Sequence, residues 1–235
     1  MTNTIRLSDR LKVTASYLPE EALFADIGSD HAYLPCYVCQ NDGHAKAIAG
    51  EVRKGPYESA LSTVRQYGLS HAVEVRLGDG LQVLEPAEVN QVVIAGMGGS
   101  LIQSILQEGK DKLSSVERII AQPNIDARNV RRWFSENGYT IIDEQILKEN
   151  GHIYEVIVAD KSADSLYGEN DAEKQLLFGP VLLENKTPAF YQKWEQELSN
   201  IERIIRQMKQ AREQDLDKIK RFEMEADWIK EVLGQ

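Results

Sequence analysis

The chain has 235 residues, of which 42% are hydrophobic and 27% charged, and its net charge at pH 7 is −10. That length fits one large domain or a core domain with a small addition, and the acidic balance argues against non-specific nucleic-acid binding. A local basic face is still compatible with it, because a handful of Lys and Arg residues is enough to contact phosphates. Two cysteines make no disulfide framework and no apolar run reaches membrane-spanning length, so we expect a cytoplasmic protein.

The first 160 residues alternate apolar strand-like runs with amphipathic helical segments, which predicts an α/β fold with a parallel sheet. An opening helix is expected to begin at Ser8 or Asp9, because either side chain can cap its first turn. Strands are expected at Leu23–Ile27, Ala45–Ala49, Val73–Arg76, Val92–Ala95, Arg118–Ala121, Tyr139–Ile146 and Ile153–Ala159. Helices are expected between the earlier strands, at Pro35–Gln40, Pro56–Tyr67, Leu101–Glu108 and Ala127–Glu136.

The last two predicted strands differ from the others in how they are connected. Only Asn150-Gly151 and their near neighbours separate them, which is a hairpin signal and makes the final strand antiparallel. A mostly parallel seven-stranded sheet closed by an antiparallel hairpin is the Rossmann-like plan of class I methyltransferases. A dehydrogenase would more often stay parallel at this edge of the sheet.

The pattern changes again in the last third of the chain. Residues 160–171 are polar and indicate a linker, so we expect a catalytic domain at 1–160 and a helical domain at 161–235. Two apolar seams separated by a polar gap at Arg212–Asp217 favour an antiparallel, coiled-coil-like helical hairpin over one long kinked helix. The seam residues are Trp194, Leu198, Ile201, Ile205 and Met208, and then Ile219, Phe222, Ala226 and Ile229.

The turn after the first strand carries Asp26, Gly28 and Asp30, and it indicates a ligand site. Ligands of open parallel sheets bind at the carboxyl ends of the strands, where a glycine lets them approach the backbone. Acidic side chains would repel a pyrophosphate but attract the sulfonium and amino groups of S-adenosylmethionine. Asp26 and Asp30 therefore favour this cofactor over NAD, although a turn of Asp and Gly residues also forms without any ligand.

The next two strand ends carry acidic residues of the same type. Glu51 follows Gly50 and can accept hydrogen bonds from both ribose hydroxyls, or it is an ordinary surface Glu. Asp79 lies between Gly78 and Gly80 and can accept a hydrogen bond from the exocyclic amine of an adenine ring. An ordinary surface turn explains the Gly-Asp-Gly sequence equally well.

Two further turns are candidates for contact with a cofactor and a base. Gly96, Gly98 and Gly99 leave the backbone bare after the fourth strand, which suits a ligand that lies against the main chain. The turn Gln122-Pro123-Asn124 follows the fifth strand, and its carbonyl and amide groups match the edge of a nucleobase. Close packing is the structural alternative for the glycines, and a proline turn is the alternative for Gln122–Asn124.

Cysteine and arginine clusters have simpler explanations. Cys36 and Cys39 are expected to be buried packing residues, because no second cysteine pair or correctly spaced histidine completes a zinc site. No metal site is predicted. Basic residues near the expected cleft either contact phosphates or are solvated surface charges. They are Arg6, Arg10, Lys12, Arg53, Lys54, Arg128, Arg131 and Arg132.

Taken together, the motifs resemble the bacterial tRNA (adenine-N1)-methyltransferases of the TrmK type. The resemblance runs in order through nearly all of the first 160 residues and also includes the helical C-terminal part. Its segments are Leu7–Leu11, Asp26–His31, Gly50–Glu51, Gly78–Gly80, Ala95–Gly99, Gln122–Asn124 and Tyr154–Glu155.

This resemblance implies methyl transfer from S-adenosylmethionine to N1 of the adenine at position 22 of tRNA, with no metal and no membrane involved. It implies cofactor contacts at Asp26, Gly28, Asp30, His31, Glu51, Asp79, Gly80, Gly96, Met97 and Gly98. Asp26 and Asn124 are the implied catalytic residues. Substrate contacts are implied at Arg6, Arg10, Gln122, Pro123, Asn124, Arg128 and Arg131. A small-molecule methyltransferase, or a non-catalytic RNA-binding protein with a vestigial cofactor site, are the alternatives.

Overall fold

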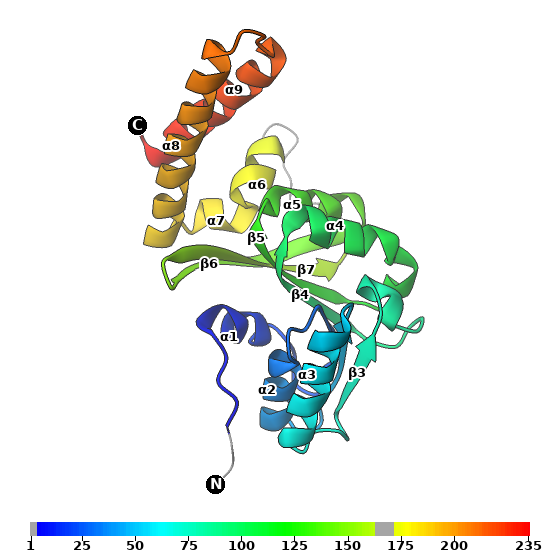
Figure 1. The fold of residues 1–235 in the computed structure, drawn as a ribbon. Helices are drawn as coiled ribbons and strands as arrows, with labels where there is room; N and C mark the ends of the chain where they lie inside the picture. The colour runs from blue at the N-terminus through cyan, green and yellow to red at the C-terminus, as the bar shows by residue number, and fades with distance from the viewer. Residues whose placement is uncertain (1–3, 163–171) are drawn as a thin grey trace. The chain divides into compact units, whose positions relative to one another are not determined.

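A computed structural model describes residues 4–162 and 172–235. Its centre is a seven-stranded sheet with the order β3-β2-β1-β4-β5-β7-β6 (Figure 1). The strands are β1 (Leu23–Ile27), β2 (Lys46–Glu51), β3 (Val73–Leu77), β4 (Gln91–Gly98), β5 (Arg118–Ile125), β6 (Tyr139–Glu149) and β7 (His152–Lys161). The first five are mutually parallel, whereas β7 runs antiparallel to both β5 and β6. The predicted α/β fold with its closing hairpin is confirmed.

Helices cover both faces of this sheet (Figure 1). One face carries α1 (Asp9–Ala15), α2 (Tyr33–Asn41) and α3 (Lys54–Gln66). Of the two predicted caps of α1, Ser8 is the one used, and its hydroxyl accepts from the N–H of Leu11. The other face carries α4 (Gly99–Glu108) and α5 (Ala127–Glu136). Two short 3-10 helices, η1 (Gly80–Val83) and η2 (Lys110–Leu113), lie in the connections on either side of β4 and α4.

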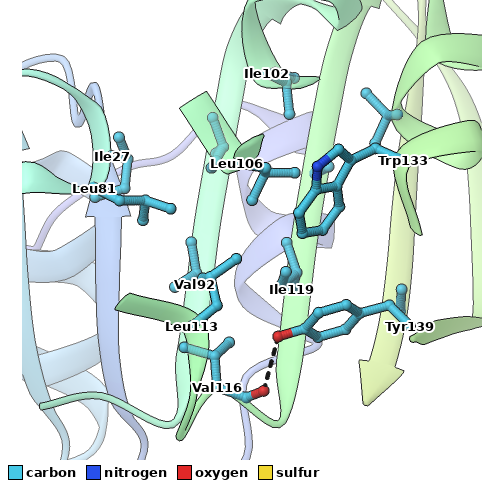
Figure 2. Close-up of a cluster of buried hydrophobic side chains, with 14 of the residues drawn as sticks. Ile27, Leu81, Val92, Ile102, Leu106, Leu113, Val116, Ile119, Trp133 and Tyr139 are labelled. Atoms are coloured by element: carbon cyan, nitrogen blue, oxygen red, sulfur yellow. Dashed lines mark hydrogen bonds between the residues drawn. The ribbon is translucent and has the colours of Figure 1, made fainter. Parts of the chain in front are cut away.

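The core beneath α4 and α5 is the larger of the two apolar clusters (Figure 2). The Trp133 ring stacks on that of Tyr139, with ring centroids 5.8 Å apart, and the Tyr139 hydroxyl donates to the carbonyl of Val116 at 3.0 Å. That hydrogen bond satisfies the only polar atom of the Tyr139 side chain, so the ring can be buried without a desolvation penalty. Helix α5 is thereby fixed against the sheet.

The core beneath α1, α2 and α3 contains both cysteines. Cys36 and Cys39 are buried in α2, as the sequence predicts, and they form no disulfide. Burial raises the pKa of the Cys36 thiol to about 12 and that of Cys39 to about 11. Both side chains are therefore neutral packing groups at physiological pH.

Strands β4 and β5 extend further than the apolar runs predict. The segment Gly96–Gly98 lies within β4, and Gln122–Asn124 lies within β5, whereas both were expected to be turns beyond the strands. Backbone pairing continues through register shifts at Met97, and this pairing needs no apolar side chain. These strand ends are therefore held by the sheet instead of by loops.

The first structural unit continues beyond the predicted boundary at residue 160. The predicted linker begins inside β7, which ends at Lys161, and residues 163–171 lie outside the described part of the chain. Helix α6 (Ala172–Phe178) packs on α5, and the unit ends at Val181, inside α7 (Pro180–Glu184). The structure thus divides the chain at 181/182, while the functional division into two domains stays a prediction.

The second unit contains the helical hairpin that the sequence predicts. Helix α8 (Pro188–Gln210) and helix α9 (Leu216–Leu233) pack on each other, with the turn between them inside the predicted polar gap. Lys209 pairs with Glu223 at 2.5 Å and Glu202 with Lys230 at 3.0 Å, so the two helices run antiparallel. The buried seam residues are Trp194, Leu198, Ile201, Ile205, Ile219, Ala226 and Ile229.

Candidate active site

A cavity of about 300 Å³ opens at the carboxyl ends of β1, β4 and β5. Parallel strands bring these ends to one edge, because Ile27 pairs with Ile94 and Ile94 with Ala121. The lining residues are Arg10, Leu11, Asp26, Gly28, Ser29, Asp30, Tyr33, Leu34, Ala95, Gly96, Met97, Asn124 and Tyr154. Residues from five segments far apart in the sequence thus surround one space, at the position where this fold class binds its ligands.

The loop between β1 and α2 has an unusual backbone. Gly28 has φ +70°, and three consecutive non-glycine residues, Asp30, His31 and Ala32, also have positive φ angles of 45°, 72° and 57°. Non-glycine residues in this region cost roughly 1–2 kcal/mol each, and such strain gathers at functional sites. A Cβ at Gly28 would lie 2.0 Å from Cε of Met97, the end of a flexible side chain, so the positive φ is what favours glycine at this position.

Asp26 is a buried carboxyl at the end of β1. Only 4% of it is exposed, and its Oδ2 accepts a hydrogen bond from the Ser29 hydroxyl at 2.6 Å. Burial raises the pKa of Asp26 to about 7, with the nearby charges of Glu51 and Asp30 adding to its effect and the hydrogen bond from Ser29 opposing it. A positively charged ligand beside Asp26 would lower this pKa, because it favours the charged form of the carboxyl.

Glu51 is a second buried acid, at the end of β2. It is 5% exposed, and burial raises its pKa, while the backbone N–H groups of Asp30 and His31 oppose that shift. Its Oε1 is buried, and no residue in 4–162 or 172–235 donates a hydrogen bond to it. An unpaired buried acceptor is costly, so this oxygen is set up to receive a donor from a ligand, such as a ribose hydroxyl.

A second, smaller cavity lies beyond Glu51. The carbonyl of Glu51 accepts from the N–H of Gly78 at 2.8 Å, and the residues that follow, Asp79 and Gly80, line a space of about 50 Å³ with Ile105 and other neighbours. Glu51 therefore lies between the loop of the larger cavity and the turn of the smaller one. An elongated ligand with hydroxyl groups in its middle matches this order of groups.

The ends of β4 and β5 are joined by a hydrogen-bond network. Gln122 accepts from Arg10 at 2.5 Å and from the backbone N–H of Gly96 at 3.1 Å, and it donates to Asn124 at 3.3 Å. Asn124 in turn donates to the carbonyl of Gly96 at 2.8 Å. The exposed carboxamide of Asn124 still has one N–H and further acceptor capacity for a substrate.

A further cavity of about 600 Å³ lies elsewhere, around the first residues of β1, β2 and β3. It contains Leu23, Lys46 and Val73 and none of the predicted site residues. Amino ends of parallel strands are not where this fold class binds its ligands. We therefore place the active site at the 300 Å³ cavity, where strained backbone and buried acids meet.

Comparison with known proteins identifies the family. The family model "TrmK: tRNA (adenine(22)-N(1))-methyltransferase" matches residues 24–231. The chain belongs to the TrmK family. It is 45% identical over 234 residues to the tRNA (adenine(22)-N(1))-methyltransferase of Bacillus subtilis, and this match covers 98% of each protein.

Solved structures agree with this membership. The crystal structure of the B. subtilis m1A22 tRNA methyltransferase TrmK has a TM-score of 0.88 and 43% identity, over 97% of this chain and 99% of that one. A Streptococcus pneumoniae protein described as a putative tRNA (m1A22) methyltransferase was solved in complex with S-adenosyl-L-methionine. It has a TM-score of 0.86 and 38% identity, over 97% of this chain and 100% of the other.

Most cofactor residues predicted for this TrmK family member are brought together. Asp26, Gly28, Asp30, Gly96 and Met97 line the larger cavity, and Asp79 and Gly80 line the smaller. His31, Glu51 and Gly98 line neither, although Glu51 lies between the two cavities and His31 follows Asp30 in the strained loop. The contacts themselves stay predictions.

Arg131 corrects one substrate prediction. Its side chain is fully buried, and it donates to Glu144 at 2.6 Å and to Glu155 at 2.8 Å. Burial alone would lower the pKa of Arg131, but the two glutamates raise it and keep the guanidinium charged. A residue enclosed in this way cannot contact a phosphate, so the prediction of Arg131 as a substrate-binding residue was wrong.

Gln122 and Pro123 correct a second prediction of substrate contact. Gln122 is fully buried and Pro123 is buried beside it, so neither side chain faces a substrate as predicted. Gln122 instead holds Arg10 and Gly96 in place. Arg6 is exposed and Arg128 half-buried, and neither lines the cavity.

Sequence reasoning missed the aromatic residues of the site. Tyr33 and Tyr154 both line the cavity, and the Arg10 guanidinium lies 5.3 Å from the centroid of the Tyr154 ring. Ser29, which hydrogen-bonds Asp26, was also missed. The available signal was their position, because each lies within or directly beside a segment that carries the family resemblance.

Proposed function

We propose that this protein transfers the methyl group of S-adenosylmethionine to N1 of adenine 22 in tRNA. The observation that carries the proposal is the unpaired, buried Oε1 of Glu51, between a cavity with a buried acid and a cavity that carries Asp79. Those groups fit a cofactor with a cationic end, ribose hydroxyls and an adenine. Family membership supports the reaction, and it names the modified position in related proteins.

The proposed cofactor contacts follow the two cavities. Asp26 and Asp30 would attract the sulfonium and amino groups, Glu51 would accept from the ribose, and Asp79 from the adenine amine. The bare backbone at Gly96 would let the ligand approach closely. S-adenosylmethionine supplies a methyl group that its sulfonium makes electrophilic.

Catalysis by this site is proposed to rest on alignment instead of strong base chemistry. Neutral adenine has a free lone pair at N1, so no group has to create the nucleophile. Asn124 is proposed to hold the edge of the base, since its carboxamide is exposed in the cavity and fixed by Gln122 and Gly96. Asp26 is proposed to stabilise the positive charge that the base acquires.

Substrate contact is proposed for the remaining basic candidates. Arg10 lines the cavity with its guanidinium fixed by Gln122, and Arg6 lies exposed just before α1. Both are suited to meet tRNA phosphates, which need only a few cations on one face. In the described part of the chain no helix is long and apolar enough to cross a membrane, and no three His, Cys, Asp or Glu residues group as metal ligands. We propose that the reaction takes place in the cytoplasm.

The direct test uses methyl-labelled S-adenosylmethionine and unmodified tRNA transcripts. One transcript carries adenine at position 22 and its control carries guanine. Digestion to nucleosides should give labelled 1-methyladenosine from the first transcript only. Cofactor binding without any labelled nucleoside would instead indicate a small-molecule methyltransferase or a vestigial site.

A further inference from the structure

The wall of the larger cavity carries two tyrosines that the cofactor contacts do not use. Tyr33 is the first residue of α2 and is 43% exposed, and Tyr154 lies near the start of β7. Both line the cavity beside Asp26, Gly28 and Asn124. Both side chains therefore bring an aromatic ring to the wall of this cavity.

The Tyr154 ring has two neighbours, the Arg10 guanidinium and the His152 ring, whose centroid lies 6.3 Å from its own. The Arg10 guanidinium lies 5.3 Å from the centroid of the Tyr154 ring, and Arg10 itself is fixed by a 2.5 Å hydrogen bond to the buried Gln122. A cation over an aromatic face is an attractive contact. The Tyr154 ring is therefore fixed in orientation but still accessible from the cavity, which suits the binding of a flat ligand.

Tyr33 is mounted on the strained loop. It directly follows the three residues with positive φ, and its ring lies beside that of His31, with centroids 5.7 Å apart at a tilt of 34°. A loop with such restricted backbone angles presents the ring in a defined direction, because the flanking residues cannot rotate freely. Two aromatic surfaces thus reach one cavity from opposite ends of the first unit's sequence.

The cofactor does not account for these surfaces. In the proposed pose its adenine lies at Asp79 in the smaller cavity, and its cationic, aliphatic end lies at Asp26 in the larger. The remaining aromatic group that must enter the larger cavity is the target base. Its N1 lies on the Watson–Crick edge, so a paired adenine has to leave its stack before reaction and loses stacking energy.

We propose that Tyr33 and Tyr154 receive the extruded target adenine by stacking against its ring, while Asn124 contacts its edge. This inference rests on the proposed function and names the residues that bind the base. Stacking of a base on an aromatic side chain is worth about 1–3 kcal/mol, which corresponds to roughly fivefold to 150-fold in affinity. It depends on the flat ring and not on the hydroxyl.

The test compares Tyr33→Leu and Tyr154→Leu with Tyr33→Phe and Tyr154→Phe. Steady-state methylation of tRNA and calorimetric binding of S-adenosylmethionine are measured for each. We expect each Leu variant to lose about tenfold or more in kcat/KM for tRNA, each Phe variant to recover most of that loss, and cofactor affinity to change little in all four. Tyr37→Leu is the matched control, because Tyr37 lies one turn further along α2 and does not line the cavity.

A second measurement does not depend on turnover. A tRNA with 8-azidoadenosine at position 22 is irradiated with the wild-type protein and S-adenosylhomocysteine, and cross-linked peptides are mapped by mass spectrometry. Cross-links at Tyr33 or Tyr154 support the stacking site, whereas cross-links confined to other segments overturn it.

The outcomes separate this inference from the proposed function. Equal activity of Leu and Phe variants, with 1-methyladenosine still formed at position 22, overturns the stacking site and leaves the reaction intact. The Leu and Phe pattern together with methylation at a different nucleoside supports the stacking site and overturns the proposed position. Failure of the wild-type protein to methylate any nucleoside overturns both.

Discussion

At the scale of single residues, the site keeps an acid where water cannot stabilise its charge. Asp26 is buried with one hydroxyl partner, Ser29, and two acidic neighbours. Its pKa of about 7 lies well above the usual value near 3.9 that applies in the unfolded chain. The folded protein without ligand therefore binds a proton at this site that the unfolded chain releases.

Asp26→Asn should consequently stabilise the ligand-free protein, and more so at alkaline pH. For an acid whose folded pKa is raised, the penalty is absent below the unfolded pKa, grows as pH rises, and is complete above the folded pKa. With folded and unfolded values of about 7 and 3.9, the gain from Asn should grow by about 1.4 kcal/mol between pH 6 and pH 8.5. Urea unfolding at both pH values measures it.

The control for this prediction is Asp111→Asn, an exposed acid of η2. It should change the unfolding free energy by the same small amount at both pH values. A gain for Asp26→Asn that does not vary with pH would show that the carboxyl is already ionised at pH 6.

At the scale of elements, one buried arginine ties α5 to the end of the first unit. Arg131 pairs with Glu144 and Glu155, and it also donates to the carbonyls of Leu176 and Leu177 at 3.3 Å. Oε2 of Glu144 accepts from the N–H of Val181 at 3.0 Å. A Cβ at Gly179 would lie 2.5 Å from that same oxygen, so the chain passes directly over the ion pair.

Arg131→Met should therefore destabilise the protein strongly. It leaves two buried carboxyl groups without their cation, and loss of one partner of a buried pair costs about 3–5 kcal/mol. Arg132→Met on the same helix is the matched control, since its pair with Glu173 is partly exposed and worth at most about 1 kcal/mol. Urea unfolding compares the two variants.

If the loss comes from unpaired charge, the further changes Glu144→Gln and Glu155→Gln should restore part of the stability of Arg131→Met. An equal loss for Arg131→Met and Arg132→Met would contradict the role of the buried pair.

How far the sequence predicts these elements depends on where the stabilising contacts come from. The strand β1 is predicted to the residue, because a buried apolar run defines it. The ends of β4 and β5 are not, because Gly96–Gly98 and Gln122–Asn124 are held by backbone pairing across a register shift. Local pattern contains no information about such pairing.

The candidate site divides in the same way. Acids and glycines at strand ends were predictable, because parallel topology brings strand ends together. The burial of Arg131 was not, because its partners are 13 and 24 residues away and its spacing on α5 equals that of a surface arginine. The left-handed run after Gly28 left only a faint signal, since Asp and His tolerate positive φ better than most residues.

At the scale of the whole molecule, a protein of net charge −10 is proposed to bind a polyanion. Binding must then come from local groups of cations. The second unit carries such groups along its two helices, and all but Lys193, which is half-buried, are exposed. They are Lys193, Arg203, Arg206, Lys209, Lys218, Lys220 and Arg221.

Truncation tests whether this unit positions tRNA. A chain that ends after Glu184 keeps α7 and all the hydrogen-bond partners of Arg131 named above. We therefore expect it to fold and to bind S-adenosylmethionine like the full chain. It should methylate tRNA far more slowly, with a weaker salt dependence of tRNA binding, because cations have been removed. Filter binding at several salt concentrations and methylation assays measure both effects.

A shorter chain that ends after Asp164 is the informative comparison. It lacks the carbonyls of Leu176 and Leu177 and the N–H of Val181, so it should be less stable than the chain ending after Glu184. Full methylation of tRNA by the longer truncation would leave the helical unit a structural or assembly role.

The place of β7 between β5 and β6 sets the order in which the sheet can be completed during synthesis. Strand β6 emerges first, and among the described strands it pairs with β7 alone, so its pairing is complete only when residue 161 has been made. Until then the edge of β5 that pairs with β7 is open as well, and the unpaired backbone groups of an open strand edge can pair with other chains. At about 5–20 residues per second this interval lasts on the order of a second, and a nascent chain stalled within it would be prone to aggregation.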